Sequence, residues 1–409
     1  MHVRPTRKSG CLVVTSLAQL YLGLQVPLIR TDTRMSPSPP PATLPLSQRL
    51  LRLAIVLFLF FVSIEWMAES FKLFGSGLTA QLLNLTSNPF TALFVGILTT
   101  SIVQSSSATT SMVVALVAAG SLQLPLAVPI IMGANIGTSI TNTLVSLAHI
   151  NRSAEFRRAF AASTVHDIFN LLCVLLFFPL ELATGVFSAS GLWMARGLEG
   201  MHGLDLMSPL KLAIHPVASG MIHLLESILP ADTWWHPHAW LSLALALTLL
   251  FGSILFLTNI LKSLALQKAE TWFEDSLFKS TSRSFLIGLG LTMAVQSSSV
   301  TTSLIVPMAG AGLLSLRQIY PYTLGANIGT TITALMAALA TQNPLALAIA
   351  LVHTLFNAAG TAVFLPLRAV PIYLASRLAD VSMRSRVIPF AYVLTVFFLI
   401  PVAFIFLMD

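Results

Sequence analysis

Two copies of one short polar motif carry the side chains in this sequence that are best suited to chemistry. Each copy is a glutamine followed by three serines, at residues 104–107 and 296–299. Hydroxyl and amide oxygens suit a hard cation such as sodium, by analogy with other hard cations. An anion such as phosphate needs the opposite, namely O–H and N–H donors such as the amides at a helix N-terminus. Two such motifs brought together would therefore offer ligands to a cation and an anion at once.

The motifs belong to a longer internal duplication. Residues 100–141 align with residues 292–333 without a gap at an offset of 192 residues, and more than half of the positions are identical. Both copies continue into a Gly-Ala-Asn-Ile-Gly-Thr stretch, and a weaker echo relates 166–170 to 353–357. A lone serine or threonine is best explained by helix packing, but a duplicated pattern of this length favours function.

Composition places these motifs in a membrane. The 409 residues are 56% hydrophobic and 9% charged, whereas soluble domains carry about 25% charged residues. A spanning helix needs about 20 largely apolar residues, and seven segments qualify: 50–70, 124–148, 159–183, 239–261, 319–340, 345–366 and 389–408. Two further apolar segments, 90–120 and 284–312, are interrupted midway by the serine clusters, and each half is too short to cross alone.

Loop charges predict the orientation of these spans. Three loops that are rich in Arg and Lys are expected in the cytoplasm, and the mixed-charge loop is expected outside. Three full crossings separate the two glutamines, so the second serine-tipped segment should enter from the side opposite to the first. Inverted repeats with binding sites at their interface are typical of secondary transporters.

The resulting fold class is an all-α polytopic membrane protein with two inverted repeats. Each repeat should contain a re-entrant helical hairpin and a broken transmembrane helix, unwound at 133–137 or 325–329, because glycine is a poor helix residue. The predicted repeats are 49–183 and 239–409, joined by an extracellular loop at 184–238.

The N-terminal 48 residues are predicted to be an extension and linker. A mildly apolar run at 11–29 follows three basic residues and resembles a signal peptide. The alternative that we favour is that translation starts at Met35.

Several other functions find no support in the sequence. The net charge of +7 comes from short basic clusters beside apolar segments, which does not favour nucleic acid. Neither a Walker loop nor a dinucleotide fingerprint is present, so no cofactor is expected. The intramembrane His166 and His353 have two readings of equal weight, a functional role and hydrogen bonding between helices.

Together these motifs resemble those of the type II sodium-dependent phosphate cotransporter family. The paired Gln-Ser-Ser-Ser motifs and the glycine-asparagine-isoleucine-glycine-threonine stretches are its signature, and the likeness continues through 156–160, 164–167 and 169–170. It covers roughly residues 50–407. The resemblance implies a multi-pass protein of the cell membrane that imports inorganic phosphate, driven by sodium, through alternating access. Its partners would be phosphate, sodium ions and membrane lipid, while the oligomeric state stays open.

The resemblance also implies roles for individual residues. The phosphate ligands are expected in the two motifs: Gln104, Ser105, Ser106, Ser107, Gln296, Ser297, Ser298 and Ser299. The sodium ligands are expected among oxygens in and after them: Gln104, Thr109, Thr110, Asn135, Thr138, Thr141, Gln296, Thr301, Thr302, Ser303, Asn327, Thr330 and Thr333. One departure is Ala326, where animal members often carry serine.

Two rival functions stay open at this stage. One is a sodium-coupled carrier of another small anion, such as sulfate or a carboxylate. The other is an intramembrane serine hydrolase with His166 or His353 as the base, although such an enzyme needs only one activated serine.

Overall fold

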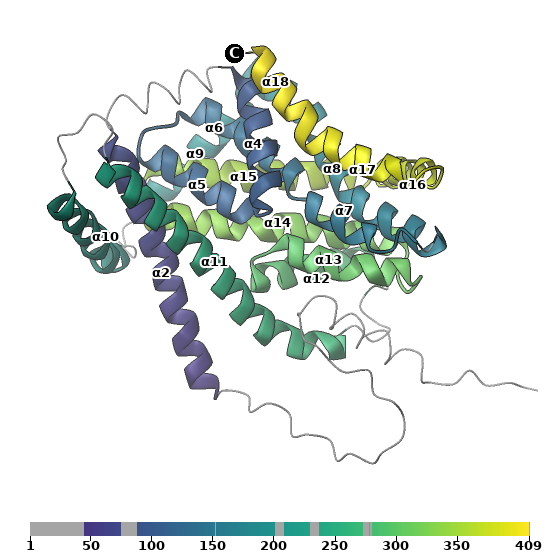
Figure 1. Cartoon of the computed structure of the whole chain (residues 1–409), viewed down its shortest axis with the longest axis horizontal. Helices are drawn as coiled ribbons and strands as arrows, with labels where there is room; N and C mark the ends of the chain where they lie inside the picture. Colours follow the sequence, from purple (N-terminus) through teal and green to yellow (C-terminus); the bar gives the residue numbers. More distant parts are fainter. Residues whose placement is uncertain are drawn as a thin grey trace, which may run out of the picture. The chain divides into compact units, whose positions relative to one another are not determined.

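The computed structural model describes residues 45–74, 88–151, 153–200, 208–229, 237–272, 278 and 280–408. The chain divides into two units, 1–48 and 49–409. The extension predicted at 1–48 therefore lies outside the described residues except for 45–48. Every regular element among the described residues is a helix (Figure 1).

Seven helical segments are long and apolar enough to cross a membrane. They correspond in number and place to the seven predicted spans, which are thus confirmed by length and composition. The helices that form them are α2 (Leu46–Leu73), α6 (Leu124–Gly137) with α7 (Ile140–Leu147), α8 (Ser153–Thr184), α11 (Pro237–Trp272), α14 (Leu316–Thr341), α15 (Pro344–Phe364) and α17 (Val387–Leu394) with η1 (Thr395–Leu399) and α18 (Ile400–Met408).

Both serine clusters interrupt helices, as the sequence predicts. The first separates α4 (Pro89–Val103) from α5 (Ser106–Ala118), and the second separates α12 (Thr281–Val295) from α13 (Ser298–Gly310). Each of these four helices has 13 or 15 residues, which is shorter than the roughly 20 needed to span a bilayer.

The predicted unwinding at 133–137 and 325–329 is wrong. Both stretches are helical, and α14 runs without a break; in the first copy the interruption comes just afterwards, at residues 138–139. The glycines serve close packing instead. A Cβ on Gly133 would lie 2.0 Å from the carbonyl oxygen of Leu93 in α4, and one on Gly325 would lie 2.0 Å from that of Phe285 in α12. Glycine lets the helix backbones approach to this distance.

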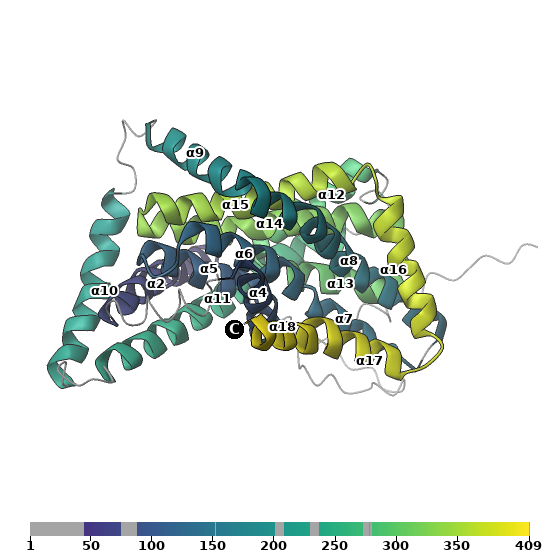
Figure 2. The same ribbon diagram turned by 90° about the horizontal axis from the view of Figure 1, so that it is seen from above.

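Helices from the two halves of the sequence interlock. The α5 helix packs on α14 and α15, while α13 packs on α7 and α8. The helices α14 and α15 lie side by side in both views (Figures 1 and 2). Three shorter elements complete the unit: α9 (Val186–Gly200) against α15, α10 (Ser208–Ile228) against α11, and α16 (Ala369–Ser382) against α8. The serine tips are consequently surrounded by helices from both halves.

Candidate functional site

The backbone has the same geometry at the two Gln-Ser-Ser-Ser tips. Gln104 has φ 55° and ψ 26°, and Gln296 has φ 56° and ψ 27°. Left-handed torsions are uncommon for residues other than glycine and cost about 1 kcal/mol or more. Each glutamine thus ends one helix and turns the chain directly into the next, and strain retained at two matching positions is a feature typical of functional sites.

The first serine of each motif caps the helix that follows. The hydroxyl of Ser105 accepts a hydrogen bond from the Ala108 N–H at 3.2 Å, and that of Ser297 accepts one from the Val300 N–H at 3.3 Å. This is the usual N-cap arrangement. It places the positive end of a helix dipole at each tip, where the first N–H groups have no intrahelical partner.

Contacts join the second tip to the first half of the chain. The Ser107 hydroxyl donates to the Gln296 carbonyl oxygen at 3.3 Å, and the Ser299 hydroxyl donates to the Thr138 carbonyl oxygen at 3.4 Å. The structure therefore brings the two Gln-Ser-Ser-Ser motifs together although they are 192 residues apart. Ser106, Ser107 and Ser298 are buried there, while Gln104 is exposed.

Several predicted sodium ligands already satisfy their hydroxyls within the protein. Thr138 and Thr330 each bond the carbonyl four residues earlier, at 2.8 and 3.1 Å. Thr302 bonds Asn142 across the two halves at 2.8 Å. Similar local bonds, mostly to carbonyls within three or four residues, hold Thr109, Thr110, Thr301 and Ser303.

Other buried oxygens in the two copies of the duplication have no partner among the described residues. The hydroxyls of Thr141 and Thr333, which occupy equivalent positions in the duplication, are both unpaired. The Gln296 side-chain oxygen and the Ser298 hydroxyl are unpaired too. An unsatisfied buried polar group costs about 1–3 kcal/mol, so these oxygens are suited to a ligand that supplies positive charge or a proton.

The asparagine of each Gly-Ala-Asn-Ile-Gly-Thr stretch, Asn135 and Asn327, joins the two halves of the chain by hydrogen bonds. The Asn327 side-chain oxygen lies 3.3 Å from His166 Nε2, and the Asn135 side-chain oxygen lies 3.4 Å from His353 Nε2. Asn170 donates to the Asn135 carbonyl oxygen at 2.7 Å. Both histidines are thus engaged with asparagines through Nε2, which supports their reading as hydrogen-bonding groups between helices, and neither side chain bonds a serine in the part of the chain that the structure describes.

The equivalent of Asn170 in the second copy makes the matching bond. Asn357 donates to the Asn327 carbonyl oxygen at 3.0 Å. The Asn327 amide also donates to the side-chain oxygens of Asn170 and Asn357, at 3.1 and 3.3 Å. The predicted sodium ligands Asn135 and Asn327 therefore have little free hydrogen-bonding capacity in this conformation.

A buried carboxylate near this network is absent from the predicted ligand set. Asp167 is 2% exposed, and its Oδ2 accepts hydrogen bonds from Thr143 at 3.1 Å and from Tyr392 at 3.0 Å. Its Oδ1 has no partner in the described part of the chain. An acidic residue inside a span is a functional candidate by default, and that signal is present in the sequence.

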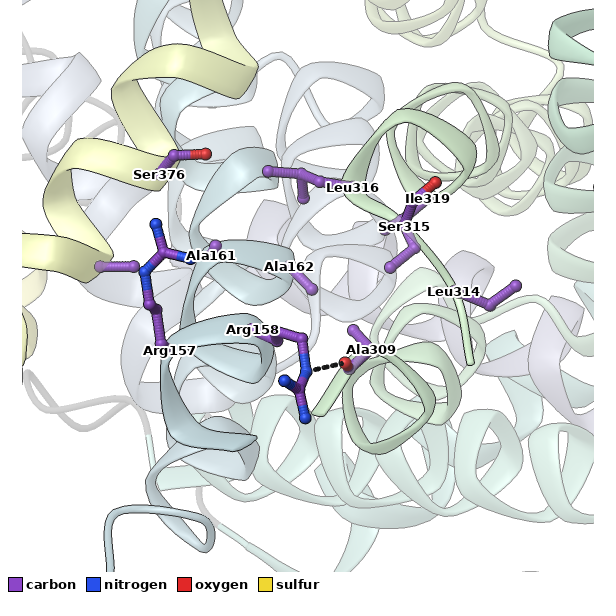
Figure 3. A pocket seen from close by; sticks show the side chains of 11 residues that line it. Arg157, Arg158, Ala161, Ala162, Ala309, Leu314, Ser315, Leu316, Ile319 and Ser376 are labelled. Atoms are coloured by element: carbon purple, nitrogen blue, oxygen red, sulfur yellow. Dashed lines mark hydrogen bonds between the residues drawn. The ribbon is translucent and has the colours of Figure 1, made fainter. Parts of the chain in front are cut away.

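A separate cavity of about 140 Å³ lies between α8, α13, α14 and α16 (Figure 3). The Arg158 guanidinium, drawn with a dashed line to Ala309, donates to the carbonyl oxygens of Ala309 and Gly310 at the end of α13. Arg157 pairs with Asp380 of α16, and its hydrogen bond lowers the pKa of that carboxyl. Both arginines thus bond neighbouring helices. We therefore assign them a structural role and do not assign this cavity a ligand.

Comparison with known proteins identifies the family. The profile described as Na+/Pi-cotransporter matches residues 59–196 and 249–370, which is more than half of the chain. The chain belongs to the Na+/Pi-cotransporter family. Among the relatives of this chain is mouse sodium-dependent phosphate transport protein 2A, 35% identical over 419 residues. The human sodium-dependent phosphate transport protein 2B is 32% identical over 442 residues.

These alignments cover 84% and 86% of the chain, but only 65% and 64% of the mouse and human relatives. No solved structure matches. Family membership and the seven apolar helices together make this cotransporter-family chain a multi-pass membrane protein.

Proposed function

We propose that this chain is a symporter that imports inorganic phosphate across the cell membrane, driven by sodium, through alternating access. The observation that carries the proposal is the meeting of the two Gln-Ser-Ser-Ser tips, with the Ser107 hydroxyl bonded to the Gln296 carbonyl. Each tip presents a helix N-terminus, which suits an anion. Family membership and the names of the mouse and human relatives agree with this activity.

We infer that residues 49–183 and 239–409 are two inverted repeats with re-entrant hairpins, joined by an outer loop at 184–238. The matched torsions of Gln104 and Gln296 support this, as do the matched close contacts of Gly133 and Gly325. The four hairpin helices are too short to span alone. With three apolar spans between the tips, the two hairpins would open to opposite sides.

The proposed site divides its ligands by charge. Phosphate would contact the two motifs, Gln104–Ser107 and Gln296–Ser299, through hydroxyls and the free N–H groups of α5 and α13. Sodium would take the unpaired oxygens, foremost those of Thr141 and Thr333. The remaining predicted sodium ligands would first have to exchange their present hydrogen bonds. Because no lysine or arginine lies in either motif, bound sodium would offset the charge of the anion and couple the two ligands.

Uptake of radiolabelled phosphate into proteoliposomes with an imposed sodium gradient tests the proposal. Sodium-dependent accumulation is expected, with little competition from sulfate or succinate. Gln296→Ala should abolish uptake while the protein stays folded in the membrane, because it removes a tip amide but keeps the backbone atoms. Stronger competition by sulfate or succinate would assign the carrier to another anion, and normal uptake by the variant would contradict the site.

A further inference from the structure

A second polar cavity, of about 220 Å³, lies away from the serine tips. Its lining includes Glu65, Glu69 and Lys72 near the C-terminal end of α2, with Ala118 at the end of α5. The turn between α14 and α15, residues 341–344, completes it. No part of the proposed transport site contributes to this cavity, so its acidic side chains need a separate explanation.

A histidine from another helix joins the two glutamates. The α10 helix lies beside the end of α2 in both views (Figures 1 and 2), and His215 of α10 reaches Glu65 with 3.2 Å between its Nδ1 and Oε1. One ligand atom each from Glu65, Glu69 and His215 lies within 4.8 Å of the other two. Glu65 and Glu69 are four residues apart, so they share one face of the helix.

These separations fit one tetrahedral metal ion. Nitrogen and oxygen ligands at roughly 2.0–2.1 Å from zinc stand about 3.3–3.4 Å apart at a tetrahedral angle. The Glu65–His215 separation of 3.2 Å is already close to this value. The Glu69 ligand atom lies within 4.8 Å of the other two, so a change of rotamer in this partly exposed side chain would bring it to the same distance.

Glu65 is a largely buried carboxylate in the lining of this cavity. Its side chain is only 6% exposed, and its Oε1 lies 3.2 Å from His215 Nδ1. The nearby Lys72 ammonium instead bonds Glu69 at 2.7 Å. A buried carboxylate is costly unless a positive charge compensates it, and a metal ion held between Glu65 and His215 would supply that charge.

We propose that Glu65, Glu69 and His215 form a binding site for a divalent transition metal of the zinc class, with water as the fourth ligand. An imidazole with two carboxylates is a ligand set that suits zinc, whereas calcium and sodium prefer oxygen alone. The metal would tie α10 to α2. The predicted topology puts this site on the outer side, where it would be open to extracellular metal.

Lys72 gives the proposal its sharpest consequence. The Lys72 ammonium is hydrogen-bonded to the Glu69 carboxylate in the present conformation, so a metal ion that binds Glu69 must displace it. Removing the lysine charge should therefore tighten metal binding, although it removes an ion pair. A purely structural ion-pair cluster predicts no such gain.

Zinc titration of the purified full-length chain in lipid nanodiscs, followed by calorimetry and thermal unfolding, tests the site. We expect near-stoichiometric zinc binding and a zinc-dependent rise in Tm, with no comparable effect of calcium. Glu65→Gln and His215→Gln should each weaken binding at least about tenfold, whereas Lys72→Gln should strengthen it severalfold. The matched control is His223→Gln, because His223 lies on the same helix, outside the cluster, with its Nδ1 3.3 Å from Glu226.

Each contrary outcome overturns the assignment. Undiminished zinc binding in His215→Gln, a half-exposed position that tolerates substitution, would place the metal elsewhere. Weaker zinc binding in Lys72→Gln would show that the cluster is an ion-pair network. If calcium bound as tightly as zinc and raised the Tm equally, the histidine would not be a ligand. If His223→Gln lost zinc binding, the metal site would include His223 of α10 and the assignment to His215 would be wrong.

Discussion

Replacing Thr333 with valine should have opposite effects on the stability of the sodium-free protein and on the sodium affinity of phosphate uptake. Thr333 is 1% exposed in α14, and its buried hydroxyl has no partner within the described ranges. Valine has nearly the same shape but carries a methyl group in place of the hydroxyl. The substitution therefore removes one oxygen and leaves the packing of the helix intact.

The two expected effects have opposite signs. An unsatisfied buried hydroxyl costs about 1–3 kcal/mol, so its removal should raise the stability of the sodium-free protein by about 1 kcal/mol. A hydrogen-bond-like contact to a charged group contributes about 1.5–3 kcal/mol. Loss of one such contact to sodium corresponds to roughly a tenfold weaker affinity or more.

Phosphate uptake measured across a range of sodium concentrations, with thermal unfolding in sodium and in choline, provides the assay. Thr333→Val should need roughly tenfold more sodium for half-maximal uptake, while its Tm in choline stays equal or rises. Thr323→Val is the matched control, since Thr323 is buried in the same helix and its hydroxyl bonds the Ile319 carbonyl at 3.1 Å. It should leave the sodium dependence unchanged.

An unchanged sodium dependence in Thr333→Val, with uptake otherwise normal, would refute the assignment of this hydroxyl to sodium. An equal shift in the Thr323→Val control would refute it as well, because the effect would then follow from general perturbation of α14. A lower Tm in choline would show that the hydroxyl has a partner and would remove the premise of the argument.

Two further predictions address packing and charge. Gly325→Ala should lower the Tm by several degrees and reduce the yield of monodisperse protein, because its Cβ would lie 2.0 Å from a carbonyl oxygen of the facing helix; Gly290→Ala, with open space at its Cβ, should not. Asp167→Asn keeps the volume of a buried side chain that accepts bonds from Thr143 and Tyr392 but removes its charge. We expect weaker sodium activation of uptake with an unchanged Tm, and normal activation would exclude this carboxylate from cation binding.

Most of the helical framework could be predicted from the sequence. Stretches of about 20 apolar residues must form spanning helices, since backbone groups in lipid have to be bonded within the segment. The same rule locates the helix breaks at the two serine clusters, because the apolar runs on either side are too short. The spanning helices and the helix breaks depend on local composition, and local composition can be read from the sequence alone.

The role of the glycines at 133 and 325 could not be read in this way. Glycine permits both an unwound backbone and a close helix contact, and the choice between them depends on what lies opposite. The opposing carbonyls belong to Leu93 and Phe285, 40 residues earlier in each case. The prediction of unwinding followed local propensity, and tertiary packing decided otherwise.

The sequence by itself determined that this is a membrane protein with a duplicated polar motif, and which residue types could bind a cation and an anion. Only the tertiary structure decided which oxygens are free, since a hydroxyl such as that of Thr138 finds a carbonyl within its own helix while that of Thr333 does not. Likewise, only the structure brought His215 to Glu65, 150 residues away. Hydrogen-bond satisfaction depends on the positions of all neighbouring atoms, and residues distant in sequence supply many of them.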